Sequence, residues 1–156
     1  MKKLLLSALI LFFIGIGSSF AQTIDDEIKI VQDAFGKDKR TLVEYYMKLS
    51  GDKATAFWAV YDEFEVERKA IGKERILIIN DYMEKFTHIG EAEADALALR
   101  SLKNDAALNS LYTSYYKKFK KATSAMDAAK FLQVDFYITN TIRNAIQQEL
   151  PFLGDI

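Results

Sequence analysis

Residues 53–86, KATAFWAVYDEFEVERKAIGKERILIINDYMEKF, carry the clearest helical pattern in the chain. Apolar side chains recur there at alternating spacings of four and three residues, which is the period of one face of an α-helix. The positions on this face are Phe57, Tyr61, Phe64, Arg68, Ile71, Arg75, Ile78 and Tyr82. Gly72 costs about 1 kcal/mol relative to alanine, which permits a bend without requiring one. We therefore predict one long helix over residues 53–86.

The rest of the chain also favours helix over strand. It contains one proline, Pro151, and only seven glycines, whereas an all-β domain needs turn residues about every 8–12 positions. Apolar periodicity predicts further helices at 24–35, 39–48, 91–122 and 124–149, with Gly36 as the stop after the first. The predicted fold is a single all-α domain of about four to five helices. We expect a long-helix hairpin or bundle, which can be curved.

Several predicted helices have recognisable ends. Ser50 and Gly90 stand at N-cap positions, and Glu93 lies three residues after Gly90, where its carboxylate can cap the backbone. Ser124 with Asp127 resembles a capping box. Pro151 stops the last helix, and we expect the residues that follow, Phe152 and Leu153, to fold back onto the bundle.

The N-terminus has the pattern of a secretory signal peptide. Lys2 and Lys3 precede the apolar run 4–16, and Ser19-Phe20-Ala21 places small residues before a cleavage site. The run is shorter than the ~20 apolar residues of a membrane span. We predict a cleaved signal peptide at 1–21 and an exported domain at 22–156, periplasmic if the source is a Gram-negative bacterium. No stable membrane insertion is expected after cleavage.

Composition excludes several classes of site. The chain has no cysteine and one histidine, which leaves no framework for a disulfide, a zinc site or a thiol nucleophile. Its formal net charge is −1, and cleavage removes two lysines and no acid, so the exported domain is more acidic still. This balance argues against a nucleic-acid partner. We expect no metal and no cofactor.

Two other groups of polar residues receive no functional role. Carboxylates cluster on the long helix at Asp62, Glu63, Glu65 and Glu67, but a helical di-iron site also needs histidines in Glu-x-x-His pairs. His88 lies in a predicted turn with no triad or zinc framework around it. We interpret the acidic residues as a solvated face and the histidine as an exposed turn residue.

Two basic residues, Arg68 and Arg75, lie on the apolar face of the long helix. Their stems can lie along the edge of a buried core while the guanidinium groups reach carboxylates outside it. Leucine at both positions should then be neutral or stabilising. Alternatively, part of the face is open and forms an apolar surface that carries positive charge.

A second segment, residues 112–121, also combines tyrosines with lysines. Lysines near a helix C-terminus interact favourably with its dipole, so half-buried tyrosines at a helix end suffice to explain it. The alternative is a surface that binds anionic or unfolded polypeptide, or touches a membrane. The candidate partner-binding residues from both segments are Arg68, Arg75, Tyr115, Lys117, Phe119 and Lys121.

Two short segments precede long predicted helices: Leu49-Ser50-Gly51-Asp52-Lys53 and Ile89-Gly90-Glu91-Ala92-Glu93. Both begin with an apolar residue before the N-cap, as in a hydrophobic staple. An exported, cysteine-free helical chain with such segments resembles the Spy/CpxP-type periplasmic proteins, whose Leu-Thr-x-x-Gln motif has the same physical design. This chain has Lys53 in place of the motif's glutamine and Gly90 in place of its threonine. The stretch 57–64 is also similar to one in uncharacterised exported helical proteins, which implies no activity.

The Spy/CpxP resemblance implies a curved helical homodimer that holds unfolded polypeptides without ATP or docks on an envelope stress sensor. The concave surface of such a protein mixes apolar and basic side chains, which Arg68, Arg75, Lys117 and Lys121 can supply here. We therefore expect a chaperone-like envelope protein whose partner is protein or unfolded polypeptide. The alternative is a regulatory or structural protein that binds one specific partner. An enzyme ranks third, because no catalytic motif is present.

Overall fold

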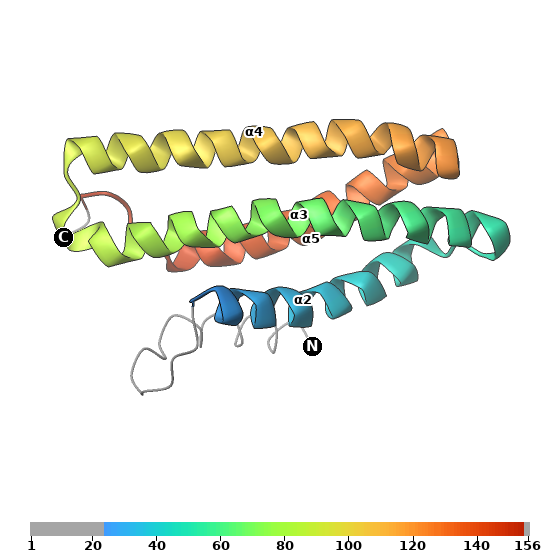
Figure 1. Cartoon of the computed structure of the whole chain (residues 1–156), viewed down its shortest axis with the longest axis horizontal. Helices are drawn as coiled ribbons and strands as arrows, with labels where there is room; N and C mark the ends of the chain where they lie inside the picture. Colours follow the sequence, from blue (N-terminus) through green and yellow to red (C-terminus); the bar gives the residue numbers. More distant parts are fainter. Residues whose placement is uncertain (1–23, 155–156) are drawn as a thin grey trace. The chain divides into compact units, whose positions relative to one another are not determined.

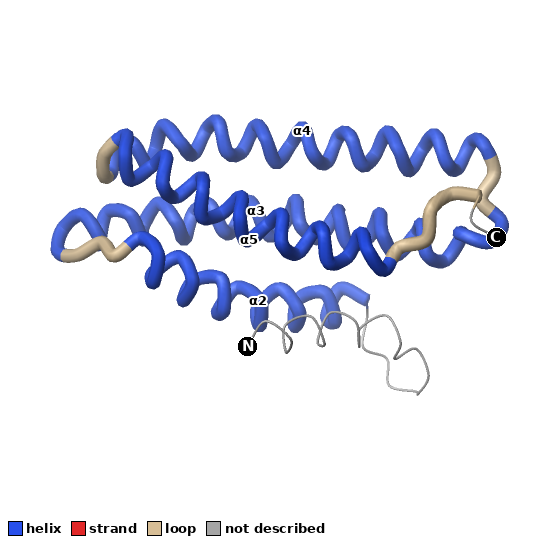
Figure 2. The backbone as a smooth tube through the Cα atoms, turned by 180° about the vertical axis from the view of Figure 1, so that it is seen from behind, coloured by secondary structure: helices blue, strands red, loops and turns tan. Residues whose placement is uncertain are grey.

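A computed structural model describes residues 24–154, which are all-α as predicted (Figures 1 and 2). The described part of the chain contains four α-helices and one 3-10 turn, with no strand among them: α2 Ile24–Met47, α3 Gly51–Lys85, η1 Phe86–His88, α4 Glu91–Ala122 and α5 Ala125–Glu149. The predicted signal peptide at 1–21 lies outside the described residues. The described residues divide into two compact units, with the boundary between Tyr45 and Tyr46.

The predicted helix at 24–35 does not end at Gly36. Instead, α2 continues through this glycine to Met47 and absorbs the second predicted helix, 39–48. A glycine inside a helix costs only about 1 kcal/mol, and Lys37, Lys39 and Arg40 directly after it are strong helix formers. The cost of one glycine is therefore too small to end the helix. The other three predicted helices agree with α3, α4 and α5 to within about two residues at each end.

The turn between α2 and α3 uses two left-handed residues. Lys48 has a φ of 52° and Gly51 has a φ of 58°. Glycine adopts this conformation without steric cost, whereas it is uncommon for lysine. Ser50 occupies the N-cap of α3 as predicted, but its hydroxyl makes no capping hydrogen bond. The left-handed residues on both sides of Ser50 shape this turn.

The starts of α4 and α5 follow the capping predictions more closely. The Gly90 N–H donates to Glu93 Oε2 at 3.1 Å. At the start of α5, the Asp127 N–H donates to Ser124 Oγ at 3.1 Å, and the Ser124 hydroxyl donates to Asp127 Oδ2 at 2.7 Å. Hydrogen bonds from Ser124 and from Lys53 hold the pKa of the Asp127 carboxyl below its usual value. At α4 the Glu93 carboxylate accepts from the N-cap backbone, and at α5 the Ser124 hydroxyl accepts from an N–H of the first turn, so both pair a donor that the helix cannot pair internally.

The helices α3, α4 and α5 form an antiparallel three-helix bundle. Figure 1 shows α4 running opposite to α3, and α5 running back in the direction of α3, and Figure 2 shows the same order from behind. The short connection between α4 and α5 defines one end of the bundle. The turn between α3 and α4 and the residues after α5 lie at the other end.

An aromatic cluster fills the bundle near the α4–α5 connection. Phe131 of α5 lies at its centre, and its ring centroid is 4.3 Å from that of Phe119 on α4. The same ring lies 5.4 Å from Phe57, 5.9 Å from Tyr61 and 5.5 Å from Phe64, all on α3, and all three contacts are edge-on. These five side chains are almost completely buried. They bring all three helices into one core.

Not every apolar position of α4 faces the core. Leu102 and Ala106 belong to the apolar positions of the helix predicted at 91–122, yet both are exposed, Leu102 to 66%. The buried face of this helix instead runs through Asn104, Leu108, Leu111 and Tyr115. The first half of α4 carries apolar residues on two sides, so its pattern did not define a single face.

Phe131→Ala should lower the free energy of unfolding by about 3–5 kcal/mol, because it opens a cavity that four other rings line. Urea denaturation of purified protein measures this loss. If the alanine variant does not fold, Phe131→Leu should show a smaller loss of the same sign.

Tyr137→Ala is the matched control on the same helix, since the Tyr137 side chain is about half exposed. It should cost less than about 1 kcal/mol. Equal losses at residues 131 and 137 would contradict the assigned core.

Candidate functional site

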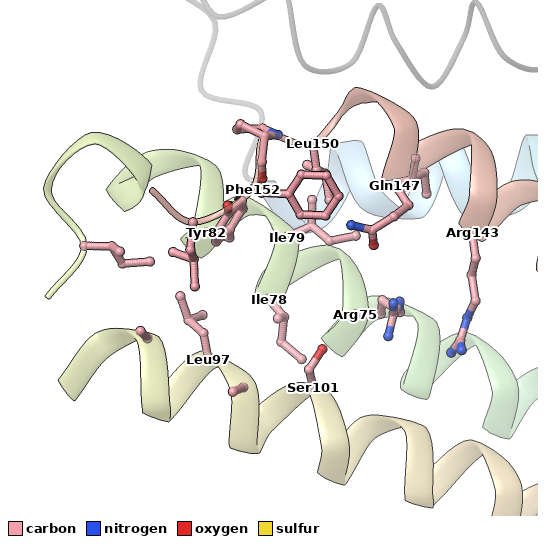
Figure 3. Close-up of a pocket in the computed structure, with 16 residues that line it drawn as sticks. Arg75, Ile78, Ile79, Tyr82, Leu97, Ser101, Arg143, Gln147, Leu150 and Phe152 are labelled. Atoms are coloured by element: carbon pink, nitrogen blue, oxygen red, sulfur yellow. Dashed lines mark hydrogen bonds between the residues drawn. The ribbon is translucent and has the colours of Figure 1, made fainter. Parts of the chain in front are cut away.

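An apolar pocket of about 460 Å³ opens at the end of the bundle opposite the aromatic cluster. We call it the α3–α4–α5 pocket (Figure 3). Its volume lies within the range of about 300–1,000 Å³ that is typical of small-molecule sites. Aliphatic and aromatic side chains from all three helices and from the segment after α5 form most of its wall: Ile78, Ile79, Leu97, Ile146, Leu150 and Phe152.

Small side chains on α4 explain why this end is not filled. The helix contributes Ala94, Ala98 and Ser101 to the pocket wall. At the other end of the bundle, the same helix contributes Tyr115 and Phe119 to the core. Close-packed interiors leave few voids larger than a water molecule, so a pocket of this size reflects a local shortage of side-chain volume.

Two arginines lie next to each other at one end of the pocket (Figure 3). Arg75 Nη1 donates to Asp105 Oδ1 at 3.1 Å, and Arg143 Nη2 donates to the same oxygen at 2.7 Å. Two guanidinium groups thus share one carboxylate, which leaves a local excess of positive charge. Burial, followed by the neighbouring charge of Arg143, lowers the pKa of Arg75, while Asp105 acts in the opposite direction.

The segment after α5 borders the pocket. The Tyr82 hydroxyl donates to the carbonyl oxygen of Pro151 at 2.6 Å, which ties this segment to α3. Phe152 and Leu153 both contribute to the wall, yet Phe152 remains 67% exposed. The segment therefore folds back as predicted, but its two large apolar side chains stay largely at the surface.

A second polar group lies inside the bundle, away from the pocket wall. Asp135 of α5 is fully buried and accepts a hydrogen bond from the Tyr112 hydroxyl at 2.6 Å. Arg68 Nε lies 3.9 Å from the same carboxylate oxygen, and Arg68 Nη2 donates to Thr139 Oγ1 at 3.4 Å. These four residues form the Arg68–Asp135 network, which connects α3, α4 and α5.

Electrostatics in this network follow from burial and charge. Burial alone lowers the pKa of Arg68, but the attraction of Asp135 and of further acidic groups outweighs it and raises that pKa. Burial, and next the charge of Asp135, raise the pKa of the Tyr112 hydroxyl. The arginine therefore stays charged and the tyrosine stays protonated, which keeps the ion pair and its hydrogen bond together.

The structure separates the six candidate partner-binding residues. Arg68 lies in the buried network, and Tyr115 and Phe119 lie in the core, with Phe119 exposed to only 1%. Lys117 and Lys121 are exposed on α4, and Arg75 lies at the pocket. The six do not form one apolar and basic surface, so the explanation of residues 112–121 as a half-buried helix end fits better.

Intramolecular contacts around Tyr115 support this explanation. Its hydroxyl donates to Glu67 Oε1 at 2.6 Å, and Lys118 Nζ lies 4.1 Å from the centre of its ring. Lys118 also pairs with Glu63 at 3.1 Å. The Tyr115 hydroxyl and the Lys118 ammonium group therefore both interact with carboxylates of α3.

Sequence reasoning missed three functional or structural side chains: Arg143, Asp105 and Asp135. A signal existed for Asp135, which lies four residues after Phe131 and three before Ile138, on the apolar face of α5. Arg143 directly follows Ile142 on the same helix. Asp105 gave no such signal, because its role depends on which arginines the fold brings to it.

Among residues 24–154, no three or more histidine, cysteine, aspartate or glutamate side chains are grouped to hold a metal ion. His88 is exposed in the 3-10 turn, as predicted, and Asp62, Glu63 and Glu67 are exposed on α3. No described helix combines the length and the apolar content of a membrane span.

No protein-family model, no curated protein and no solved structure matches this chain.

Arg68→Leu should destabilise the bundle by about 3–5 kcal/mol, because it removes a cation that faces the buried Asp135. The sequence predicted that leucine at both Arg68 and Arg75 is neutral or stabilising if their guanidinium groups reach carboxylates at the edge of the core. For Arg68 the carboxylate is instead that of Asp135, which is fully buried. The double change Arg68→Leu with Asp135→Asn should restore most of the loss, because an amide oxygen can still accept from Tyr112. Denaturant titration of both variants measures this difference. An Arg68→Leu protein as stable as the original would show that the ion pair contributes nothing.

Proposed function

We propose that this chain is an exported binding protein that acts without a catalytic step, and that its ligand site is the α3–α4–α5 pocket. The observation that supports this most directly is a pocket of about 460 Å³ with a mostly apolar wall. At one end of this pocket, two arginines share a single carboxylate. Apolar pockets with a few convergent polar groups are the usual form of binding sites. The exported location rests on the sequence pattern of residues 1–21.

The confined size of the pocket favours recognition of one specific partner. The sequence allowed a broad surface that mixes apolar and basic side chains around Arg68, Tyr115 and Phe119. Tyr115 and Phe119 are buried, and only 15% of the Arg68 side chain is exposed. The positive charge that faces an apolar wall is instead concentrated at Arg75 and Arg143. This arrangement fits a regulatory or structural envelope protein that binds one defined ligand or partner.

Chaperone-like holding of unfolded polypeptides without ATP is the second candidate. It is supported by the resemblance to Spy/CpxP-type proteins and by the exposed leucines Leu99 and Leu102 on α4. In this version, apolar segments of a client enter the pocket, and the surface leucines add weak contacts. A homodimer remains part of this proposal through the same resemblance.

Ala98→Trp should block partner capture, because Ala98 lies in the pocket wall and is exposed enough to accept a larger side chain. Ala106→Trp is the matched control on the same helix, since Ala106 is exposed and does not line the pocket. Crosslinking in cells measures capture. One or two captured partners support specific recognition, and many support holding. Capture that is equal in both variants would exclude the pocket as the site.

An aggregation assay separates the two candidates in solution. Chaperone-like holding requires that the purified protein suppress aggregation of an unfolding client without nucleotide. Ala98→Trp should weaken this protection while Ala106→Trp preserves it. No suppression at a several-fold excess of protein would eliminate this candidate.

A further inference from the structure

The wall of the α3–α4–α5 pocket offers few partners to a polypeptide backbone. Besides the two arginines at one end, its polar side chains are Ser101, Gln147 and Tyr82, and the Tyr82 hydroxyl already donates to Pro151. A peptide that enters brings an N–H and a carbonyl group with every residue, and each buried group without a partner costs free energy. A saturated hydrocarbon chain brings no such group. The apolar part of the pocket therefore suits an alkyl chain better than a peptide.

The arginine end suits an anion. Each of Arg75 and Arg143 makes one hydrogen bond in the described structure, and both bonds go to the same oxygen of Asp105. A guanidinium group has five N–H donors, so both arginines retain donors for a second carboxylate. Binding of an anion there would also offset the repulsion between the two cations. Arginine is well suited to this contact because its donors match the two oxygens of a carboxylate.

The two ends are separated by a length that suits one small amphipathic molecule. Arg75 and Tyr82, both in the wall, are seven residues apart on α3, which corresponds to ~10 Å at about 1.5 Å per residue. A medium-chain alkyl group can span this distance. Figure 3 shows Phe152, Leu150 and Ile79 grouped near Tyr82, away from the two arginines.

We propose that the α3–α4–α5 pocket binds a medium-chain aliphatic carboxylate, with the carboxylate between Arg75 and Arg143 and the alkyl chain against Ile78, Leu97 and Ile146. This inference rests on the proposed function only in requiring that the pocket is a ligand site. It does not require a polypeptide partner.

Calorimetric titration of the full exported chain with dodecanoate below its micellar concentration tests the proposal. One molecule should bind per chain and saturate. Dodecyltrimethylammonium, which has the same alkyl chain but a positive head, should bind at least about tenfold more weakly, and acetate should not bind measurably. Equal affinity for the anionic and cationic amphiphiles would overturn the proposal.

Variants locate the bound molecule. Arg143→Gln should weaken dodecanoate binding by at least about tenfold. Arg100→Gln is the matched control, because Arg100 pairs with Glu74 and Asp81 and does not line the pocket. Ala98→Trp should abolish binding, and thermal unfolding confirms that each variant is folded. Unchanged dodecanoate affinity in folded Arg143→Gln would refute the proposed orientation.

A peptide titration separates this inference from the proposed function. The probe is an apolar peptide with blocked ends. If the peptide binds in a manner sensitive to Ala98→Trp and dodecanoate does not, the proposed function stands and the carboxylate proposal fails. If dodecanoate binds and cellular crosslinking captures no partner, the carboxylate proposal stands and the polypeptide versions of the function fail. If dodecanoate does not bind and cellular crosslinking captures no partner that depends on an open pocket, both are wrong.

Discussion

Contacts among the aromatic rings around Phe131 determine how α3, α4 and α5 meet. Rings from all three helices fill the bundle near the α4–α5 connection. The three helices extend well beyond this cluster. At the other end of the bundle their packing depends on the side chains that each helix supplies at that end. On α4 these are Ala94, Ala98 and Ser101, which are too small to reproduce the aromatic core. The pocket is therefore a consequence of how side-chain volume is distributed along α4.

The Arg68–Asp135 network lies among helices that are already held by the aromatic cluster. Burial of two charges is costly, so a buried pair of this kind adds little net stability, although the loss of one partner is strongly destabilising. Arg68 and Arg75 show how local surroundings decide the role of a side chain, because they lie one heptad apart on the same face of α3. The first meets a fully buried carboxylate on α5, and the second meets Asp105 on α4, which it shares with Arg143.

Apolar periodicity predicted where the helices lie better than it predicted which side chains contact one another. The long helices from residue 51 onward followed from spacing and capping residues, which are local properties. Gly36 was predicted to end a helix but does not, because one glycine raises the free energy of a helix only slightly. The exposure of Leu102 could not be predicted, because the first half of α4 carries apolar residues on two sides. Of the two arginines selected from the sequence, Arg75 lies at the pocket and Arg68 lies in the Arg68–Asp135 network. The partners of Arg75 could not be predicted, because Asp105 lies 30 residues from Arg75 and 38 from Arg143, and only the register of three helices brings them together.

The combination of an apolar wall and a charged end bears on selectivity. Apolar contact is non-directional and would accept many ligands of suitable size. Two guanidinium groups that share one carboxylate add a requirement for the sign and position of charge, which an apolar surface alone cannot impose. Larger residues at Ala98 and Ser101 would extend the close packing of the aromatic end and leave a sealed bundle. The small side chains of α4 thus keep the pocket open where larger ones would close it.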